Sequence, residues 1–402
     1  MNSLWRHCGW MLLGSSLILA LSLGVRHGFG LFLSPMSAEF GWGREVFAFA
    51  IALQNLVWGL IQPFTGAFAD RFGVRRTVLI GGLLYVAGLA LMACSDSPAS
   101  LALSAGLLIG LGLSGTSFSV LLGAVGQAAP VEKRSMAMGV AAAAGSFGQF
   151  VMLPGSLALI GALGWSGALL ALAALVALLP PLAALLRSPA PPVPAAGHAQ
   201  TLGEALREAA GHSGFWLLAL GFFVCGFQVV FIGVHLPAYL VDQHLPAQVG
   251  TTVLALVGLF NVFGTYTAGW LGSCYAKPKL LVALYLLRGV VIVAFLWAPP
   301  SEWSAYAFGM AMGFLWLSTV PLTNGTVATL FGVRNLSMLG GIVFLFHQLG
   351  SFLGGWLGGY LYDRTGSYML VWQICIGLSV MAALLNWPVR ERPVARLQAQ
   401  AR

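Results

Sequence analysis

Two arginines stand inside long apolar runs of the sequence, where a charged side chain is costly. Arg26 lies in the run 10–34 and Arg288 in the run 278–298, whereas all eleven acidic residues fall in loops or at the ends of such runs. Placing an arginine at mid-bilayer costs about 2.5–3.5 kcal/mol on insertion scales. Such a residue usually has a function, commonly the binding of an anion in a water-filled cavity. The pattern therefore predicts a binding site for a small organic anion.

Arg26 is the first candidate for the anion ligand. It shares one helical face with Ser15, Ser22 and Gly30. The alternative is that its side chain snorkels to the membrane surface, because Arg26 lies about 12 Å from Ser34 at the helical rise of about 1.5 Å per residue.

Arg288 is the second candidate. It lies about 15 Å beyond Pro278 by the same rise, which is too deep for easy snorkelling. A structural hydrogen bond to carbonyl groups of neighbouring helices explains Arg288 as well as a substrate contact does.

Further polar side chains fall within the apolar runs. We expect one cavity to collect the set, although an interhelical hydrogen bond, worth only about 0.6 kcal/mol on average, is the better explanation for any single residue. His347 is also the candidate proton carrier, because it is deep in its run and a histidine titrates near neutrality. The substrate-binding candidates besides the two arginines are Asn55, Gln149, Gln228, Asn261, Trp316 and His347.

A charged turn joins two of the apolar runs. The sequence GAFADRFGVRR at 66–76 contains one Asp and three Arg within seven residues. It resembles the signature that joins transmembrane helices 2 and 3 in the major facilitator superfamily, and the preceding QPFTG at 62–66 resembles monocarboxylate transporters and oxalate–formate exchangers. We expect a cytoplasmic gate formed by Gly66, Asp70, Arg71, Gly73, Arg75 and Arg76.

Physical reasons support a gate at this turn. Gly66 allows two helices to approach closely, and Gly73 allows a tight turn. Asp70 can cap a neighbouring helix N-terminus, where the dipole favours an anion. The arginines hold the loop in the headgroup layer. The alternative is a charged loop that only sets the topology.

The resemblance implies an all-α membrane protein of twelve helices in two pseudo-symmetric halves, in which helix 1 lines a central cavity and helix 9 is peripheral. The segments 133–148 and 163–167 resemble helix 5 and its exit loop in monocarboxylate transporters. One departure matters: the substrate-binding arginine of that branch on helix 8 aligns with Thr265, so this anion contact cannot be carried over. A drug–proton antiporter is disfavoured, since helix 4 has Gly106 near the place of that family's arginine.

Composition agrees with a polytopic membrane protein. The chain has 402 residues, of which 59% are hydrophobic and 7% charged, and its mean hydropathy is +0.89. The net charge of +8 does not indicate nucleic-acid binding, because the basic residues occupy short loops without aromatic neighbours. The five scattered cysteines indicate neither a metal site nor a disulfide framework, and no nucleotide motif is present, so we expect no cofactor.

Apolar runs long enough to span a membrane divide the chain into two predicted halves. We expect an N-terminal six-helix half at 1–187, a linker with a short interfacial helix at 188–212, and a C-terminal six-helix half at 213–402. The predicted runs are 10–34, 45–68, 77–95, 100–128, 135–161, 164–187, 213–240, 248–271, 278–298, 303–327, 337–362 and 368–388.

An internal repeat supports these halves. The offsets between matching positions are nearly constant, at 203, 202 and 205 residues. The second half lacks the acidic residue and the arginines of the charged turn, so its gate is expected to be weaker. The matched pairs are Asp70 with Ser273, Ser135 with Ser337, and Gly145 with Gly350.

Basic residues predict the orientation. With both termini cytoplasmic, fifteen of the nineteen Lys and Arg lie inside and only Arg44 and Arg364 lie outside. We expect a multi-pass protein of a bacterial plasma (inner) membrane, acting as a monomer in the lipid bilayer.

These observations together predict a secondary active transporter that moves a small, monocarboxylate-like organic anion by alternating access, coupled to a proton or to an exchanged anion. Two alternatives stay open: an exporter of a neutral or drug-like compound, and a membrane sensor that binds without transport. An enzyme is not expected, because no catalytic or metal-spaced cluster emerges.

Overall fold

The computed structural model describes residues 3–42, 44–186 and 200–400. Within these ranges every regular element is a helix and there is no strand, so the all-α prediction is confirmed. Up to residue 186 the helices are α1 (Ser3–His27), η1 (Phe29–Phe32), α2 (Leu33–Phe40), α3 (Arg44–Phe72), α4 (Val74–Ala93), α5 (Pro98–Leu101), η2 (Ala102–Leu108), α6 (Ile109–Thr116), α7 (Phe118–Ala128), η3 (Val131–Lys133), α8 (Arg134–Val176), α9 (Leu179–Leu182) and η4 (Ala183–Leu185). After residue 200 they are α10 (Leu202–Ala210), α11 (Ser213–Asp242), α12 (Ala247–Cys274), α13 (Lys277–Trp297), α14 (Glu302–Leu315), α15 (Thr319–Phe331), α16 (Leu336–Thr365), α17 (Met369–Asn386) and α18 (Ala395–Gln400).

Ten helical stretches of the described residues are long and apolar enough to cross a membrane. The stretch Val131–Leu185 has 55 residues, enough for two crossings, and α8 within it bends at Gly164, whose φ of 70° is a conformation that favours glycine. The chain is therefore a multi-pass membrane protein, and the count of twelve helices stays a prediction.

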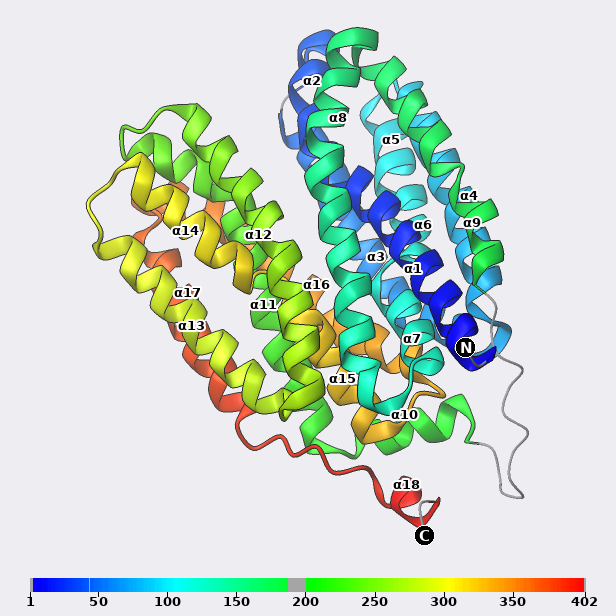
Figure 1. Cartoon of the computed structure of the whole chain (residues 1–402). Coiled ribbons are helices and arrows are strands. Elements are labelled where there is room, and N and C mark those ends of the chain that lie inside the picture. Colours follow the sequence, from blue (N-terminus) through cyan, green and yellow to red (C-terminus); the bar gives the residue numbers. More distant parts are fainter. Residues whose placement is uncertain (1–2, 43, 187–199, 401–402) are drawn as a thin grey trace. The chain divides into compact units, whose positions relative to one another are not determined.

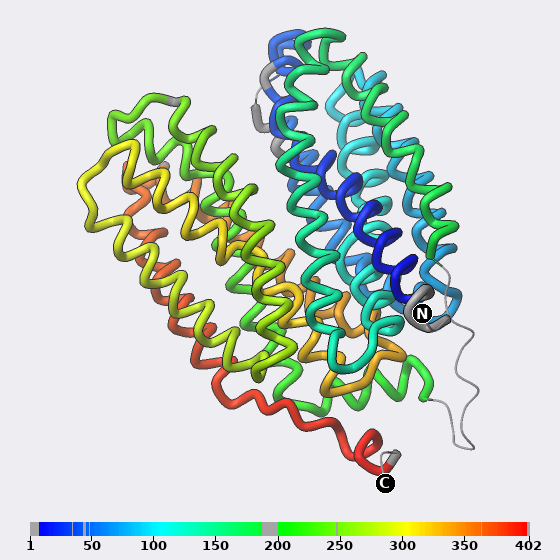
Figure 2. The backbone as a smooth tube through the Cα atoms, viewed as in Figure 1, coloured from blue at the N-terminus to red at the C-terminus, as the bar shows by residue number. Residues whose placement is uncertain are grey.

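Two compact units make up the chain, and Figure 1 and Figure 2 trace their helices. Unit 1 comprises Met1–Pro130, Ala144–Leu202 and Arg334–Gly341, and unit 2 comprises the remainder. The first turns of α16 thus belong to unit 1, and the first turns of α8 belong to unit 2. The predicted division at 187 and 213 stays a prediction. Residues 188–199 of the predicted linker lie outside the described residues, and α10 occupies the place of the short helix.

Each unit is a bundle of antiparallel and crossing helices. In unit 1, α6 packs on α3 and α4, and α7 packs on α1. In unit 2, α12 packs on α14, and α17 packs on α11 and α13. An aromatic cluster fills the centre of unit 2 around the fully buried Trp372, whose ring contacts those of Phe231, Tyr239, Phe295 and Phe308.

Some predicted spans are broken rather than continuous helices. The run 100–128 changes from α6 to α7 at Ser117, which is extended, and the run 303–327 breaks between α14 and α15. A broken helix is stable in a membrane only where protein groups satisfy the freed backbone. Side chains from neighbouring helices lie at both breaks: Trp58 Nε1 donates to Ser117 Oγ at 2.9 Å, and the Leu317 N–H donates to Asn261 Oδ1 at 3.0 Å.

Candidate functional site

Asp70 lies near the C-terminal end of α3, and its carboxylate faces the start of α16 within unit 1. Its Oδ2 accepts the backbone N–H of Met338 at 2.8 Å, and its Oδ1 accepts the N–H of Ser337 at 3.3 Å. The Gln127 amide also donates to Oδ1 at 3.3 Å. The first turn of a helix leaves N–H groups without intrahelical acceptors, and its dipole attracts an anion. Asp70 therefore caps α16.

Two glycines allow this contact. A Cβ on Gly66 would overlap the carbonyl oxygen of Ser337, so a larger residue would force α3 away from α16. Gly73 has a φ of 95° and joins α3 to α4, a backbone conformation that a residue with a Cβ rarely adopts.

The three arginines of the turn are not among the hydrogen-bond partners of Asp70. Arg71, Arg75 and Arg76 are exposed, and the ion pairs of the described residues do not involve them. The Arg71 guanidinium lies 5.2 Å from the centre of the Phe72 ring.

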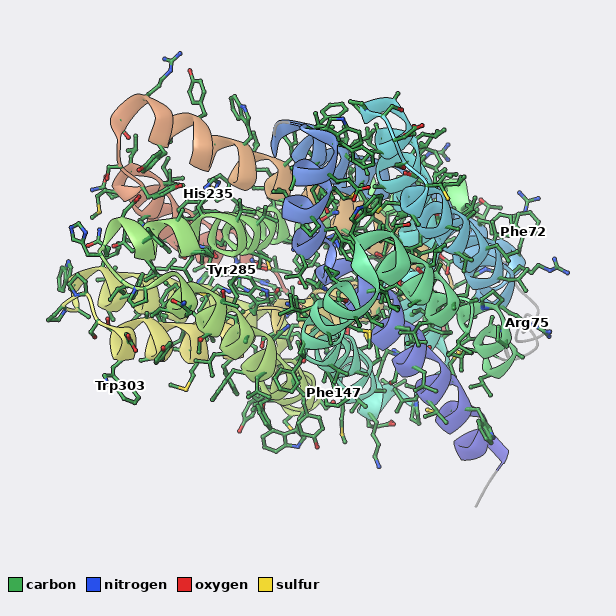
Figure 3. The ribbon with its side chains drawn as sticks, turned by 90° about the horizontal axis from the view of Figure 1, so that it is seen from above. Phe72, Arg75, Phe147, His235, Tyr285 and Trp303 are labelled. Atoms are coloured by element: carbon green, nitrogen blue, oxygen red, sulfur yellow. The ribbon has the colours of Figure 1, made fainter. Side chains whose placement is uncertain are left out.

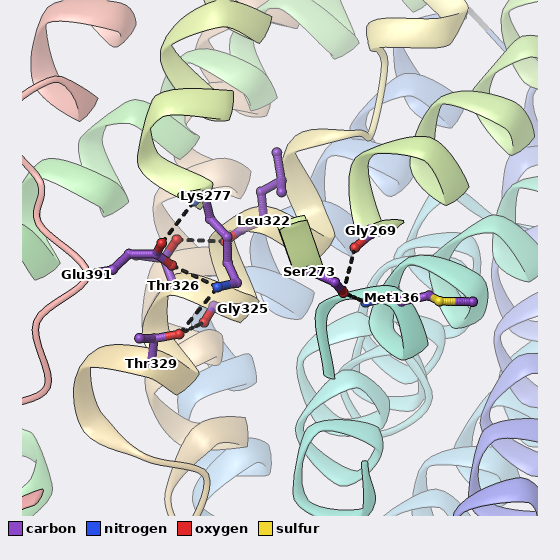
Figure 4. Close-up of polar contacts among 9 residues, drawn as sticks. All are labelled: Met136, Gly269, Ser273, Lys277, Leu322, Gly325, Thr326, Thr329 and Glu391. Atoms are coloured by element: carbon purple, nitrogen blue, oxygen red, sulfur yellow. Dashed lines mark hydrogen bonds and ion pairs between the residues drawn. The ribbon is translucent and has the colours of Figure 1, made fainter. Parts of the chain in front are cut away.

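The matching turn of unit 2 is held by neutral groups and by one ion pair, which Figure 4 shows. Ser273 Oγ accepts the backbone N–H of Met136 at 3.1 Å. Lys277 Nζ lies 2.8 Å from Glu391 Oε1, and the backbone N–H of Lys277 donates to Glu391 Oε2 at 3.0 Å. The turns of the two units thus share a geometry but differ in charge.

Arg26 combines a fixed guanidinium with an unused donor. Its Nη2 donates to Asn55 Oδ1, and the guanidinium carbon lies 5.5 Å from the centre of the Trp58 ring. Its Nε is buried and has no hydrogen-bond partner, and no carboxylate of the described residues pairs with it. The side chain as a whole is half-buried. A cation with a free N–H and no counter-ion is suited to an anionic ligand.

Arg288 has a different environment, because its side chain is only 1% exposed and is surrounded by acceptors. Nε and Nη2 donate to the carbonyl oxygen of Leu315 at 3.2 and 2.7 Å, and Nη2 also donates to the carbonyl oxygen of Trp316. Nη1 lies 3.4 Å from Gln228 Oε1, and Nη2 lies 3.5 Å from Cys225 Sγ. The guanidinium therefore caps the end of α14 at the break in this span.

The amide candidates mostly bind neighbouring helices. The Gln228 side chain donates to the Cys375 carbonyl at 2.9 Å and to Ser379 Oγ at 2.7 Å. Asn261 accepts at the break before α15. Gln149 is half-buried on α8.

His347 is 7% exposed and lies between two aromatic rings of unit 2. Ring centres of Phe222 and Phe344 lie 4.7 and 5.4 Å from its own. Nδ1 lies 3.2 Å from Gln348 Oε1, whereas Nε2 is buried without a hydrogen-bond partner.

The structure brings some of the predicted site residues together and leaves others apart. Arg26 contacts Asn55 in unit 1, and Arg288 contacts Gln228 and Trp316 in unit 2. His347 and Gln149 have no hydrogen bond to either arginine.

The sequence did not lead us to two residues that contact the arginines, Trp58 beside Arg26 and Cys225 beside Arg288. Trp58, beside Arg26, falls three residues after Asn55 and so on the same face of α3, which was the available signal. Cys225, beside Arg288, could have been found from the repeat, since an offset of 203 residues relates it to Ser22.

The same offset of 203 residues relates the side chains around Ser22 in unit 1 to those around Cys225 in unit 2. Ser22 Oγ lies 2.8 Å from Thr116 Oγ1, and Cys225 Sγ lies 3.2 Å from Thr319 Oγ1. The Tyr85 hydroxyl donates to the Ser22 carbonyl at 3.0 Å. Tyr85 corresponds to Arg288 by the same offset, so one repeat has a phenol where the other has the guanidinium.

Comparison with known proteins agrees with this architecture. The model of the Major Facilitator Superfamily matches residues 12–331 and 252–402. Monocarboxylate transporter 11 of Mus musculus is 29% identical over 384 residues, which cover 91% of this chain and 84% of the relative. The uncharacterized MFS-type transporter YcxA of Bacillus subtilis (strain 168) is 25% identical over 400 residues, 94% of each protein.

A solved structure shows the same fold. The crystal structure of the Major Facilitator Superfamily transporter FucP in the outward conformation superposes with a TM-score of 0.73, at 17% identity, over 93% of this chain and 98% of that one. The resemblance noted in the charged turn is thus confirmed for the superfamily and for monocarboxylate transporters. The chain is a transporter and not an enzyme, and it belongs to the Major Facilitator Superfamily.

Proposed function

We propose that this transporter moves a small monocarboxylate across the membrane by alternating access, coupled to a proton or to an exchanged anion. The names of the relatives support this class, because three of them are monocarboxylate transporters 11, 12 and 13. On this proposal the protein is a monomer in a bacterial inner membrane, and its termini and charged turn face the cytoplasm.

The unused donor of Arg26 is the observation that carries the substrate class. Asn55 holds one terminal nitrogen, while the buried Nε–H has no acceptor. A carboxylate placed beside this edge would supply both the missing acceptor and the missing negative charge, through a charge-assisted hydrogen bond. Arg288 has carbonyl acceptors on its Nε and Nη2, so we assign it a structural role at the break between α14 and α15.

Asp70 supplies the gate in this proposal. Its carboxylate and Gly66 attach the first turns of α16 to α3 within unit 1, while the rest of α16 belongs to unit 2. Releasing and re-forming this cap would change how α16 is held during the transport cycle. A two-state element of this kind is biased by any residue that stabilises one state.

The proton has two possible carriers, His347 and the substrate itself. His347 is the candidate within the protein, because it is a buried histidine in a stretch long and apolar enough to span the membrane. The remaining polar candidates, Gln149 and Asn261, would shape the site rather than carry charge.

Transport in proteoliposomes tests the proposal. We expect purified protein to accumulate a short carboxylate such as propionate under an imposed proton gradient, and not propionamide, which has nearly the same shape without the charge. Arg26→Gln should abolish the accumulation, with Arg288→Lys as a matched charge-retaining control at the structural arginine. Equal transport of the acid and the amide would overturn the anion class.

A further inference from the structure

A shallow apolar groove runs along unit 1 between α3, α4 and α6. Its volume is about 320 Å³, and Phe64, Phe68, Ile80, Leu84 and Leu111 are among the residues that line it. Phe64 is 72% exposed and Ile80 is 47% exposed, so large apolar side chains of this groove face outwards. In a membrane-spanning unit such an apolar surface is suited to contact with lipid tails.

Two arginines extend the groove towards the charged turn. Arg71 follows Phe68 by three residues on α3, and Arg76 precedes Ile80 by four residues on α4. Residues three or four apart lie on the same face of a helix, so the positions of Arg71 and Arg76 lie one turn beyond groove-lining residues of α3 and α4.

Neither of these arginines forms an ion pair within the described residues, although the Arg71 guanidinium lies 5.2 Å from the centre of the Phe72 ring. Both are exposed, and the ion pairs of the described residues are Lys277 with Glu391 and Arg396 with Glu208. The comparison with Lys277 is informative, because it stands in the matching turn of unit 2 and has a carboxylate partner. The turn of unit 1 therefore presents two unneutralised cations at the end of an apolar groove.

We propose that this groove, together with Arg71 and Arg76, binds one anionic phospholipid. An acyl chain would lie against Phe68, Ile80 and Leu84, and the phosphate would bind the guanidinium groups. Guanidinium matches phosphate geometrically through paired N–H donors. Clusters of basic residues at the membrane surface attract anionic lipids, at about 1 kcal/mol per residue. This site uses Arg71 and Arg76 of the charged turn but none of the contacts that Asp70 and Gly66 make with α16, and it does not depend on the transported compound.

Arg75 provides a matched control within the same turn. It is exposed and carries the same charge, but the residue four positions later is Leu79, which does not line the groove. Figure 3 shows Arg75 and Phe72 at the outer edge of the helices of unit 1. A diffuse electrostatic attraction would use all three arginines equally, whereas a groove site needs Arg71 and Arg76.

Native mass spectrometry of the detergent-purified full chain can count bound lipids. The probes are phosphatidylglycerol and phosphatidylcholine with identical acyl chains. We expect wild type to retain one phosphatidylglycerol in preference to phosphatidylcholine, and the double variant Arg71→Gln/Arg76→Gln to lose this preference about tenfold, as expected for a lost charge-assisted contact. Arg75→Gln should behave like wild type. An equal effect of Arg75→Gln, or no preference in wild type, would overturn the proposal.

A second pair of variants tests the acyl-chain part of the site. Ile61 lines the groove away from the arginines, and Ile61→Trp should fill it, whereas Ile61→Val should leave it open. We expect Ile61→Trp to lower retention of phosphatidylglycerol while circular dichroism and gel filtration stay unchanged. Glycerophosphoglycerol, which has the headgroup without chains, should not compete. Unchanged retention in Ile61→Trp, or full competition by the chain-free headgroup, would show a simple phosphate site and overturn the groove.

Discussion

The carboxylate of Asp70 and the backbone N–H of Met338 are joined by a 2.8 Å hydrogen bond at the start of α16. The repeat places Ser273 and Met136 in the same relationship at 3.1 Å. The acceptor is a carboxylate in one case and a hydroxyl in the other. Burial raises the pKa of Asp70 to about 7, whereas the N–H groups of Ser337 and Met338 favour the ionised form of this carboxyl. Hydrogen bonds to charged groups contribute about 1.5–3 kcal/mol, against about 0.5–1.5 kcal/mol for neutral ones. Any gate formed by these turns is therefore asymmetric.

Asp70→Asn should lower the transport rate more than the substrate affinity. The amide has nearly the same shape but removes the negative charge at the α16 N-terminus, so one of two conformations loses stability while the substrate contacts stay intact. Initial uptake rates in proteoliposomes and binding measured by thermal stabilisation separate the two effects. Equal transport by Asp70→Asn and wild type would contradict the gate assignment.

Ser273→Ala should have the same kind of effect but a smaller one. It removes a single neutral hydrogen bond to Met136, about 0.5–1.5 kcal/mol. The two variants should be compared at equal reconstitution density. A larger rate loss in Ser273→Ala than in Asp70→Asn would mean that charge does not set the strength of the contact.

The sequence predicts the membrane fold well because length and hydropathy decide which segments can span. It does not predict where a span is broken, since Ser117 lies in the segment SGTSFS and 316–318 precedes TVPLTNG, and both of these more polar segments still fall inside runs long and apolar enough to span. The breaks depend on partners from other helices, such as Trp58 and Asn261. Hydropathy indicates which segments can be buried in a membrane, but it does not indicate whether their backbone forms one continuous helix.

The two intramembrane arginines show the same limit. Sequence alone ranks Arg26 and Arg288 by depth, but their partners come from residues 27 to 63 positions away on other helices. Neither the contact of Arg26 with Asn55 nor that of Arg288 with the Leu315 carbonyl follows from periodicity. The roles of Gly66 and Asp70 in the charged turn could be predicted from the sequence. A glycine permits two helices to approach closely, and an aspartate can cap a helix N-terminus, whichever helix the partner belongs to.

Arg288→Gln should destabilise the protein without changing its ligand specificity. The shorter amide leaves the carbonyl groups of Leu315 and Trp316 without their guanidinium donor, and an unsatisfied buried group costs about 1–3 kcal/mol. Thermal unfolding in detergent should show the loss, and Arg288→Lys should restore part of it. Normal stability combined with lost carboxylate binding would instead place the substrate at Arg288.

His347→Gln should flatten the pH dependence of net uptake while counterflow exchange survives. Histidine changes charge near neutrality and glutamine does not, so only steps that need the proton should respond. Uptake and exchange measured from pH 5.5 to 8 distinguish the two modes. A pH profile like that of wild type would move the proton to the substrate.

Arg26 decides the substrate class, and two substitutions test it. Arg26→Lys keeps the charge but loses the planar fork, so carboxylate binding should weaken only partly. Arg26→Gln removes the charge and should nearly abolish binding, since a charge-assisted hydrogen bond contributes about 1.5–3 kcal/mol. Membrane insertion should be unharmed in Arg26→Gln, because the substitution removes a costly intramembrane charge.

Asn55→Leu is the matched control, because it removes the side chain that holds Nη2 and leaves the cation in place. We expect it to weaken binding less than Arg26→Gln does. The measurement is stabilisation of each purified variant by propionate, with propionamide as the neutral comparison. If Arg26→Gln responds to propionate as wild type does, the free Nε–H is not the substrate contact, and a neutral substrate becomes the better explanation for this transporter.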